Sequence, residues 1–309
     1  MSAESKWPRI AVVGAGAVGS YFGGMLARAG APVMMIGRAT FVEAVRKSGL
    51  LLDTVAFKEM VHPMASTEIA AAKDADVVLF SVKTTDTAAS AQELAKQIRP
   101  QAVVVSLQNG VNNAEEIRKA SGIDALPAVV YVAASMPAPG QLKHLGRGDL
   151  VLGPRNERTD MIASLFLRAQ VPCRISENIE GELWTKLVWN CALNAVSGLG
   201  RVTYGEILAS ADAKRVLEAV VREVLAVAKA KGIQPPGLAD PRVALAGALK
   251  IAEQMSGTRS STAQDMARGK RTEIDSLNGH VARLGESLDV PVPVNHTLYA
   301  LVKLYEAGF

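Results

Sequence analysis

Short apolar runs of strand length alternate with helical patterns through the first half of the chain. The runs predict strands at residues 9–13, 33–36, 77–82, 103–107, 128–133 and 146–153. Helices are predicted between them, at residues 20–29, 86–98 and 113–120. Runs that are apolar at nearly every position are typical of strands buried on both faces of a parallel sheet. The alternation therefore predicts a doubly wound α/β domain.

The pattern changes near Ser176. From Ile179 onward the chain predicts long helices, at residues 182–199, 211–231, 241–255 and 272–288. Turn residues at Pro235-Pro236-Gly237 and at Gly257 separate these helices. We therefore predict an α/β domain at residues 1–176 and an all-α domain at residues 177–309.

Composition agrees with a globular protein of two domains. The chain has 309 residues, 49% of them hydrophobic, and its 34 Lys and Arg stand against 30 Asp and Glu. The charges are interspersed and form no basic block, so the net charge of +4 favours small anionic ligands over nucleic acid.

Cysteine and histidine usage predicts neither a disulfide framework nor a metal site. The two cysteines, Cys173 and Cys191, form no CxxC motif, and the four histidines lack metal-ligand spacing. The first eight residues have no apolar signal region, and no apolar run approaches the ~20 residues of a membrane span. We expect a cytoplasmic protein that does not associate with membranes.

A glycine-rich turn follows the first predicted strand. Gly14-Ala15-Gly16-Ala17-Val18-Gly19 matches G-x-G-x-x-G, and a helix is predicted after it. The first glycine permits a tight turn, the second lets a pyrophosphate approach the backbone, and the third lets the helix pack on the strand. The motif alone also fits an ordinary glycine turn, but its place between strand and helix predicts a Rossmann-type dinucleotide site.

The end of the second predicted strand indicates which dinucleotide binds. NAD sites usually place Asp or Glu there to bind the ribose 2′-hydroxyl, and this chain has neither between Gly14 and Val42. Arg38 follows the strand instead, and a guanidinium suits a 2′-phosphate. Arg38 also fits a solvated surface arginine, yet the missing acid and the present base together predict NADP.

Two further strand ends carry candidate cofactor residues, because ligands of open parallel sheets bind at the carboxyl ends of strands. Lys83 follows the strand at residues 77–82, and Asn109 follows the strand at residues 103–107. Lys83 equally fits a solvated lysine, and Asn109-Gly110 fits an ordinary turn. We predict that both lie beside the cofactor.

Lys186, Asn190 and Asn194 are spaced by four and therefore lie along one stripe of the predicted helix. The rest of this helix is largely apolar. The stripe is either an ordinary exposed face or the lining of a cleft. An exposed face would more often use Glu or Lys than asparagine, which favours the cleft.

A second polar constellation follows at residues 257–265. Ser261 and Gln264 have the spacing of a helix capping box, which is a structural alternative to any binding role of Ser261. Further on, Glu273 lies at the start of the helix predicted at residues 272–288. There, an acid favours the helix dipole without any catalytic role.

Taken together, these residues resemble the ketopantoate reductase (2-dehydropantoate 2-reductase) family over nearly the whole chain. The specific segments are Trp184-x-Lys186-x-x-x-Asn190-x-x-x-Asn194 and Arg259-Ser260-Ser261…Gln264-Asp265…Arg271-Thr272-Glu273-Ile274-Asp275…Asn278-Gly279. The resemblance implies NADPH-dependent reduction of a 2-keto acid, 2-dehydropantoate to pantoate above all.

The resemblance also implies residue roles. Lys186 matches the general acid, and Glu273 matches a glutamate of the active site. Asn190, Asn194 and Ser261 match residues that hold the substrate. The matches of Arg38, Lys83 and Asn109 lie by the cofactor, with Arg38 at the 2′-phosphate.

Two positions depart from the family's best-known members. Thr258 and Tyr204 stand where those members have asparagine, at positions associated with substrate. The reaction type survives these changes, but they leave the substrate open between 2-dehydropantoate and another 2-keto acid.

Two alternatives to this activity stay open: a related β-hydroxyacid dehydrogenase, and a sensor that binds NADP without turnover. A homodimer is also left open, because an apolar patch on the helical domain would support one.

Overall fold

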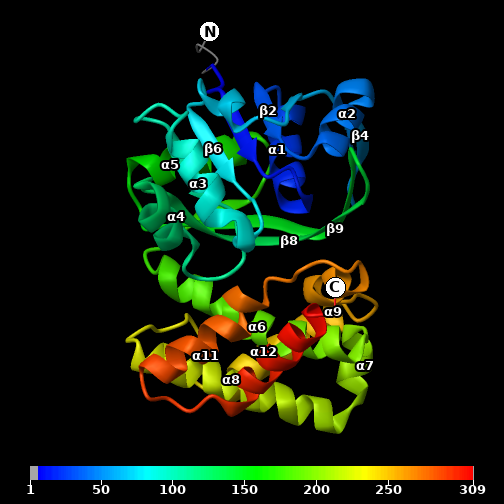
Figure 1. Ribbon diagram of the computed structural model, residues 1–309, viewed down its shortest axis with the longest axis vertical. Helices are drawn as coiled ribbons and strands as arrows, with labels where there is room; N and C mark the ends of the chain where they lie inside the picture. Colours follow the sequence, from blue (N-terminus) through cyan, green and yellow to red (C-terminus); the bar gives the residue numbers. More distant parts are fainter. Residues whose placement is uncertain (1–5, 309) are drawn as a thin grey trace. The chain divides into compact units, whose positions relative to one another are not determined.

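The computed structural model describes residues 6–308, and their contacts divide them into two compact units (Figure 1). The division falls between Ile179 and Glu180, whereas the sequence places the domain boundary at residues 176–177. The N-terminal unit is α/β and the C-terminal unit is helical, so the predicted fold class is confirmed.

The N-terminal unit is built on one mixed sheet of ten strands. Its strands are β1 Ile10–Val13, β2 Val33–Ile36, β3 Leu50–Asp53, β4 Lys58–Val61, β5 Met64–Ser66, β6 Val77–Phe80, β7 Val103–Ser106, β8 Leu126–Ala138, β9 Gln141–Leu152 and β10 Cys173–Ile175. Its α-helices are α1 Ala17–Arg28, α2 Ala39–Ser48, α3 Thr87–Ala95, α4 Asn113–Ser121 and α5 Glu157–Arg168. Strands β5-β2-β1-β6-β7-β8 are consecutive and parallel, which is the doubly wound part of the sheet.

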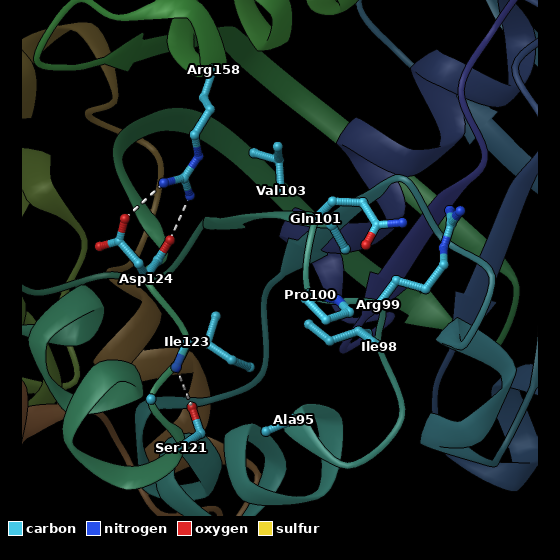
Figure 2. Close-up of a pocket in the computed structure, with 12 residues that line it drawn as sticks. Ala95, Ile98, Arg99, Pro100, Gln101, Val103, Ser121, Ile123, Asp124 and Arg158 are labelled. Carbon is cyan, nitrogen blue, oxygen red and sulfur yellow. Dashed lines mark hydrogen bonds and ion pairs between the residues drawn. The ribbon is translucent and has the colours of Figure 1, made fainter.

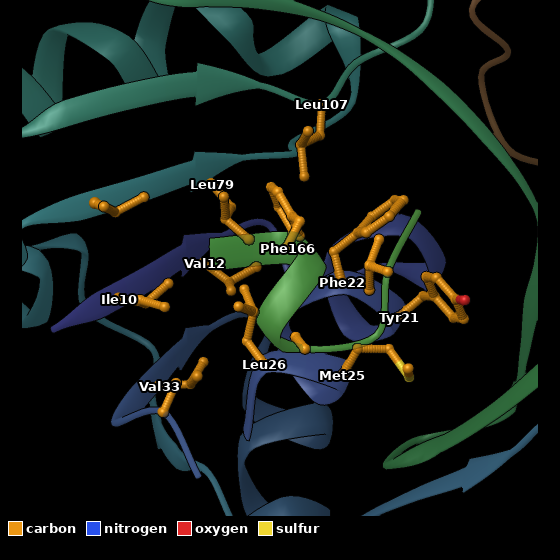
Figure 3. Packing of buried hydrophobic residues seen from close by; sticks show 14 of the residues in the cluster. Ile10, Val12, Tyr21, Phe22, Met25, Leu26, Val33, Leu79, Leu107 and Phe166 are labelled. Carbon is orange, nitrogen blue, oxygen red and sulfur yellow. The ribbon is translucent and has the colours of Figure 1, made fainter. Parts of the chain in front are cut away.

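Alternate residues of the central strands pack against different helices. Ile10 and Val12 of β1 belong to a buried cluster with Phe22 of α1 and Phe166 of α5 (Figure 3). Ala11 and Val13 belong to a second cluster, which includes Leu94 of α3 and Ile117 of α4. Because successive strand side chains point to opposite faces, β1 is buried on both sides. This double burial is why the strand is a continuous apolar run.

The late strands differ from the prediction. β8 extends to Ala138 and β9 begins at Gln141, so the two form a long antiparallel hairpin with register shifts along it. The sequence predicts only residues 128–133 and 146–153. The additional part is rich in small and polar residues and is only partly buried, so it lacks the apolar run of a central strand.

The C-terminal unit contains α6 Ile179–Gly200, α7 Tyr204–Ala209, α8 Ala211–Ala230, α9 Pro241–Gln254, α10 Ser261–Ala267, α11 Asn278–Ser287 and α12 Pro293–Glu306. Helix α6 begins at the last residue of the first unit. Helices α9, α11 and α12 all contact α8. Among residues 6–308, no helix is both long and apolar enough to cross a membrane.

One predicted helix is wrong at its start. The helix expected from residue 272 begins at Asn278, after a 3₁₀ turn at Ile274–Ser276. Thr272 and Glu273 precede both elements. The backbone N–H of Thr272 donates to the side chain of Glu306 at 2.6 Å and not to a helical carbonyl. The suggestion that Glu273 merely favours a helix dipole therefore loses its structural basis.

Candidate active site

The four strand ends that carry candidate cofactor residues lie at one edge of the sheet. β1 pairs in parallel with β2 and with β6, and β6 pairs in parallel with β7. The residues that follow them, Gly14, Arg38, Lys83 and Asn109, are therefore brought to the same carboxyl edge.

The first and third glycines of the motif are required by close packing. Gly14 has φ +101°, and a Cβ atom there would lie 2.5 Å from the Val82 nitrogen. A Cβ atom on Gly19 would lie 2.3 Å from the Gly14 carbonyl oxygen and 2.9 Å from Val12. These contacts leave no room for a side chain, so the turn passes tightly against β6 and α1 packs closely on β1.

Gly16 differs from its neighbours, because a Cβ atom there would meet nothing within 4 Å. Helix α1 begins directly after it, at Ala17 and Val18, and its first bond closes from Ser20 back to Gly16. The N–H groups of the first turn have no helical carbonyl within reach. Open space beside free N–H groups at a helix N-terminus suits a phosphate.

Arg38 lies next to this turn. It is the exposed N-cap of α2, and a Cβ atom on the preceding Gly37 would lie 2.9 Å from the Ala15 Cβ atom. The glycine turn and the start of α2 therefore approach closely. The backbone of Arg38 therefore lies near the turn, at the end of the strand where a dinucleotide's adenosine ribose would be expected.

A buried glutamine that the sequence analysis did not single out joins the other two strand ends. Gln108 donates from Nε2 to the Val82 carbonyl oxygen at 3.1 Å and to Thr87 Oγ1 at 2.7 Å. It thereby links the loop of Lys83 to the loop of Asn109. The signal in the sequence that could have identified Gln108 is its place as a polar residue directly after an apolar strand.

The row on α6 is not an ordinary exposed face. Lys186 and Asn190 are half-buried, and Asn194 is only 5% exposed. A buried asparagine must find polar partners. The Tyr204 hydroxyl donates to Asn194 Oδ1 at 3.5 Å, which is a long bond.

Burial raises the pKa of Tyr204 to about 12. The phenol therefore stays protonated at neutral pH and meets Asn194 as a neutral donor. The backbone N–H of Tyr204 donates to the Thr258 carbonyl oxygen at 2.9 Å. The two residues that depart from the family pattern are thus in direct contact with each other.

The capping role expected for Ser261 belongs to Ser260. The Ser260 hydroxyl accepts from the Ala263 N–H at 3.0 Å and donates to the Asn194 carbonyl oxygen at 3.0 Å. The predicted capping box at Ser261 is therefore wrong, and the helix has a single side-chain cap at Ser260 instead. Ser261 is the exposed first residue of α10, beside the bond that joins α10 to α6.

Glu273 lies in the segment that leads into α11. It is half-buried and just precedes the 3₁₀ turn. The segment is tied to α6 five residues later, because Asn278 Nδ2 donates to the Cys191 carbonyl oxygen at 3.1 Å. The C-terminal unit thus links the α6 row, the start of α10 and the Glu273 segment by hydrogen bonds.

A cavity of about 580 Å³ lies elsewhere in the N-terminal unit (Figure 2). Residues leading into β7 and β8 line it, so it lies at the amino edge of the sheet, opposite the glycine turn. Its Arg158 guanidinium donates to Asp124 Oδ2 at 2.7 Å, as Figure 2 shows. This cavity includes none of the predicted site residues. In the part of the chain that the structure describes, no group of three or more His, Cys, Asp or Glu residues is placed to hold a metal ion.

Comparisons with known proteins cover both units. Residues 10–157 match the model of ketopantoate reductase PanE/ApbA, and residues 178–306 match the model of its C-terminal domain. The 2-dehydropantoate 2-reductase of Pyrococcus horikoshii is 33% identical over 303 residues, which cover 97% of this chain and 98% of that protein.

Solved structures agree. A PanE/ApbA family ketopantoate reductase from Ralstonia eutropha JMP134 superposes with a TM-score of 0.92 at 45% identity, covering 97% of this chain and 99% of that one. A ternary complex of D-mandelate dehydrogenase with NADH and anilino(oxo)acetate has a TM-score of 0.89 at 24% identity, covers 97% and 99% of the two chains, and shares the fold. The two family models together cover the glycine turn, the α6 row and the Glu273 segment, and the Pyrococcus relative covers 97% of the chain. The chain therefore belongs to the ketopantoate reductase PanE/ApbA family.

Proposed function

We propose that this protein reduces a 2-keto acid to a 2-hydroxy acid with NADPH, and that 2-dehydropantoate is the substrate. The observation that carries the proposal is the half-buried row of Lys186, Asn190 and Asn194 on α6, in a chain whose relatives are named 2-dehydropantoate 2-reductases. A row of one cation and two amides offers hydrogen-bond donors to a carbonyl and a carboxylate.

The edge of the N-terminal sheet fits a dinucleotide. The open space at Gly16 and the N–H groups of Ala17 and Val18 would hold the pyrophosphate, and Arg38 would hold a 2′-phosphate. Lys83 and Asn109 follow neighbouring strands of the same edge. When bound, NADPH supplies the hydride that reduces the keto carbon.

Lys186 would act on the carbonyl oxygen. Negative charge grows on that oxygen as the carbon is reduced, and an ammonium group both stabilises the charge and delivers a proton from Nζ. The proton ends on the product hydroxyl, and Lys186 is left neutral until it regains a proton from solvent.

The remaining predicted residues would hold the substrate in place. Asn190 and Asn194 lie on the same stripe as Lys186, and Ser261 lies beside the Ser260–Asn194 bond. Glu273 is tied to α6 through Asn278. A carboxylate near the reacting centre would orient the Lys186 ammonium or the substrate hydroxyl.

A different 2-keto acid is the second candidate substrate. The observation that favours it is the bond from the Tyr204 hydroxyl to Asn194 of the α6 row, because a phenol stands there in place of an amide at a position associated with substrate. A phenol ring offers an apolar surface and a single hydroxyl, which suits a substrate side chain less polar than that of 2-dehydropantoate.

Oxidation of NADPH, followed at its absorbance maximum, tests the proposal. The panel is 2-dehydropantoate, 2-oxoisovalerate, pyruvate and phenylglyoxylate, each assayed with NADPH and with NADH. Turnover of 2-dehydropantoate with preference for NADPH supports the proposal. Turnover of another panel member alone reassigns the substrate, and NADPH binding without oxidation of any kind supports a sensor.

We also propose that the protein is cytoplasmic and forms a homodimer. Light scattering of the purified protein measures its molar mass and so tests the homodimer.

A further inference from the structure

Helix α12 presents a row of polar side chains to the segment that carries Glu273. Tyr299, Lys303 and Glu306 are spaced by four and three, so they lie on one face of the helix. All three bond to the residues that flank Glu273, within segment 272–275. Glu273 is therefore held from both sides by another helix.

The first contact between α12 and this segment joins Glu306 to Thr272. Glu306 Oε1 accepts from the Thr272 backbone N–H and from its hydroxyl, both at 2.6 Å, and Glu306 Oε2 accepts from Lys303 Nζ at 3.0 Å. The Glu306 side chain is only 5% exposed and Thr272 is 1% exposed. A carboxylate is costly to bury unless its oxygens are fully bonded, and here both oxygens have donors.

The second contact joins Tyr299 and Lys303 of α12 to Asp275. Lys303 Nζ donates to Asp275 Oδ2 at 2.9 Å, and the Tyr299 hydroxyl donates to Asp275 Oδ1 at 2.9 Å. Burial opposes the charge on Asp275, but these hydrogen bonds keep its pKa below the usual value. Lys303 thus bridges Asp275, which follows Glu273 in the chain, and the Glu306 carboxylate that holds Thr272.

The same segment is anchored to α6 at its far end. Asn278 Nδ2 donates to the Cys191 carbonyl oxygen at 3.1 Å and to Asn295 Oδ1 of α12 at 3.0 Å. Cys191 directly follows Asn190. Asn278 therefore connects the segment of Glu273 both to α6, which carries Lys186, and to α12.

We propose that Glu306 and Lys303 are positioning residues that fix Glu273 relative to the α6 row. The inference rests on the proposed function, because it needs Glu273 to act in the reaction. Apolar packing would stabilise this contact as well as an ion pair with a buried carboxylate does. Hydrogen bonds to the backbone N–H of Thr272 and to Asp275 are directional as well. They therefore fix the position of the residues between them, which include Glu273.

The test is a double-mutant cycle with NADPH and the panel substrate that the wild type reduces fastest. Glu306→Ala is expected to lower kcat about 10- to 100-fold, because a small displacement of a group in the reaction has effects of that order. Glu306→Gln keeps an acceptor for Thr272 and is expected to restore part of that loss. In a Glu273→Gln background, Glu306→Ala should cost little further, because its effect acts through Glu273.

Hydrogen exchange gives a second readout that does not depend on turnover. Glu306→Ala should speed exchange in the peptide that covers residues 272–277. Val302→Ala is the matched control, since Val302 is a buried residue of the same helix outside the polar row. It should lower Tm while leaving kcat and the exchange of residues 272–277 unchanged. If Glu306→Ala does not fold, Lys303→Met takes its place in both readouts.

The positioning role is overturned if the kcat losses of Glu273→Gln and Glu306→Ala multiply in the double variant. It is also overturned if Glu306→Ala leaves the hydrogen exchange of residues 272–277 unchanged. A wild-type kcat in Glu273→Gln overturns it as well. If kcat falls in Glu273→Gln but not in Glu306→Ala, this inference is wrong and the proposed function still stands. Absence of turnover by the wild type defeats the proposed function, and the exchange measurement alone then decides whether Glu306 holds the segment.

Discussion

The backbone N–H of Tyr204 donates a hydrogen bond to the carbonyl oxygen of Thr258 at 2.9 Å. Tyr204 begins α7, and Thr258 lies in the turn between α9 and α10, so residues 54 positions apart form one local unit. The side chain of Tyr204 also reaches Asn194 in the α6 row. A change at either position is therefore expected to alter the same part of the candidate substrate site.

Restoring asparagine at both positions should shift substrate preference. Tyr204→Asn removes the phenol ring and adds an amide, and we expect it to raise kcat/KM for 2-dehydropantoate relative to phenylglyoxylate by about tenfold, the effect of one hydrogen bond. Because the residues touch, adding Thr258→Asn should give an effect that differs from the product of the single changes. If the ratio of kcat/KM for the two substrates is unchanged in all three variants, neither residue determines substrate specificity.

Tyr204 should also make stability fall at alkaline pH. Its pKa is about 12 in the folded protein, because of burial, and about 10 when unfolded. The folded state thus favours the neutral phenol, so this contribution is complete below pH 10 and is lost as pH rises towards 12. Between pH 8 and pH 11, the wild type should lose more unfolding free energy than Tyr204→Phe, by an amount on the order of 1 kcal/mol. Urea unfolding at the two pH values measures this, and equal losses would show that the phenol is not protected.

The glycine turn offers a matched pair of substitutions. Gly19→Ala forces a Cβ atom to 2.3 Å from the Gly14 oxygen and should lower stability by several kcal/mol, within the range of severe core changes. Gly16→Ala meets nothing within 4 Å and should keep the wild-type Tm while weakening NADPH binding, because the methyl group occupies the space meant for pyrophosphate. Calorimetry of unfolding and titration with NADPH check both. Wild-type NADPH affinity in Gly16→Ala would argue against this site.

Arg38 should discriminate between the two nicotinamide cofactors. Arg38→Ala removes a guanidinium that only NADPH can use, so KM for NADPH should rise by about tenfold or more, while KM for NADH stays near its wild-type value. Arg215→Ala, at an exposed arginine of α8, is the control and should change neither. Equal losses with both cofactors would contradict the assignment of the 2′-phosphate to Arg38.

The central strands of the sheet could be predicted because both of their faces are buried. β2 matches its prediction at both ends, and β1, β6 and β7 differ by one or two residues. The edge strands could not be predicted. Three of the four residues of β4 are exposed, and β5 has only three residues, so neither forms an apolar run. β4 pairs with the preceding strand β3, and β5 pairs with β2, which lies about 30 residues earlier, so these pairings supply the order that an apolar run does not predict.

The candidate site shows the same limit. The spacing of Lys186, Asn190 and Asn194 is a local property of a helix and needs no tertiary information. The capping role of Ser260 depends on a bond to the Asn194 carbonyl oxygen 66 residues away. The non-helical Thr272 likewise depends on Glu306, 34 residues away. Local sequence contains neither partner, so it predicts neither the cap at Ser260 nor the non-helical conformation of Thr272.

Lys186 carries the chemistry of the proposal, and kcat of Lys186→Ala tests it most directly. The measurement is NADPH oxidation at saturating 2-keto acid, with Lys229→Ala, at an exposed lysine of α8, as control and with NADPH affinity determined separately. We predict a fall in kcat of about 10²–10⁴-fold with NADPH affinity unchanged, the usual contribution of a positioned acid. A kcat equal to that of the wild type would contradict the assignment of Lys186 as the proton donor.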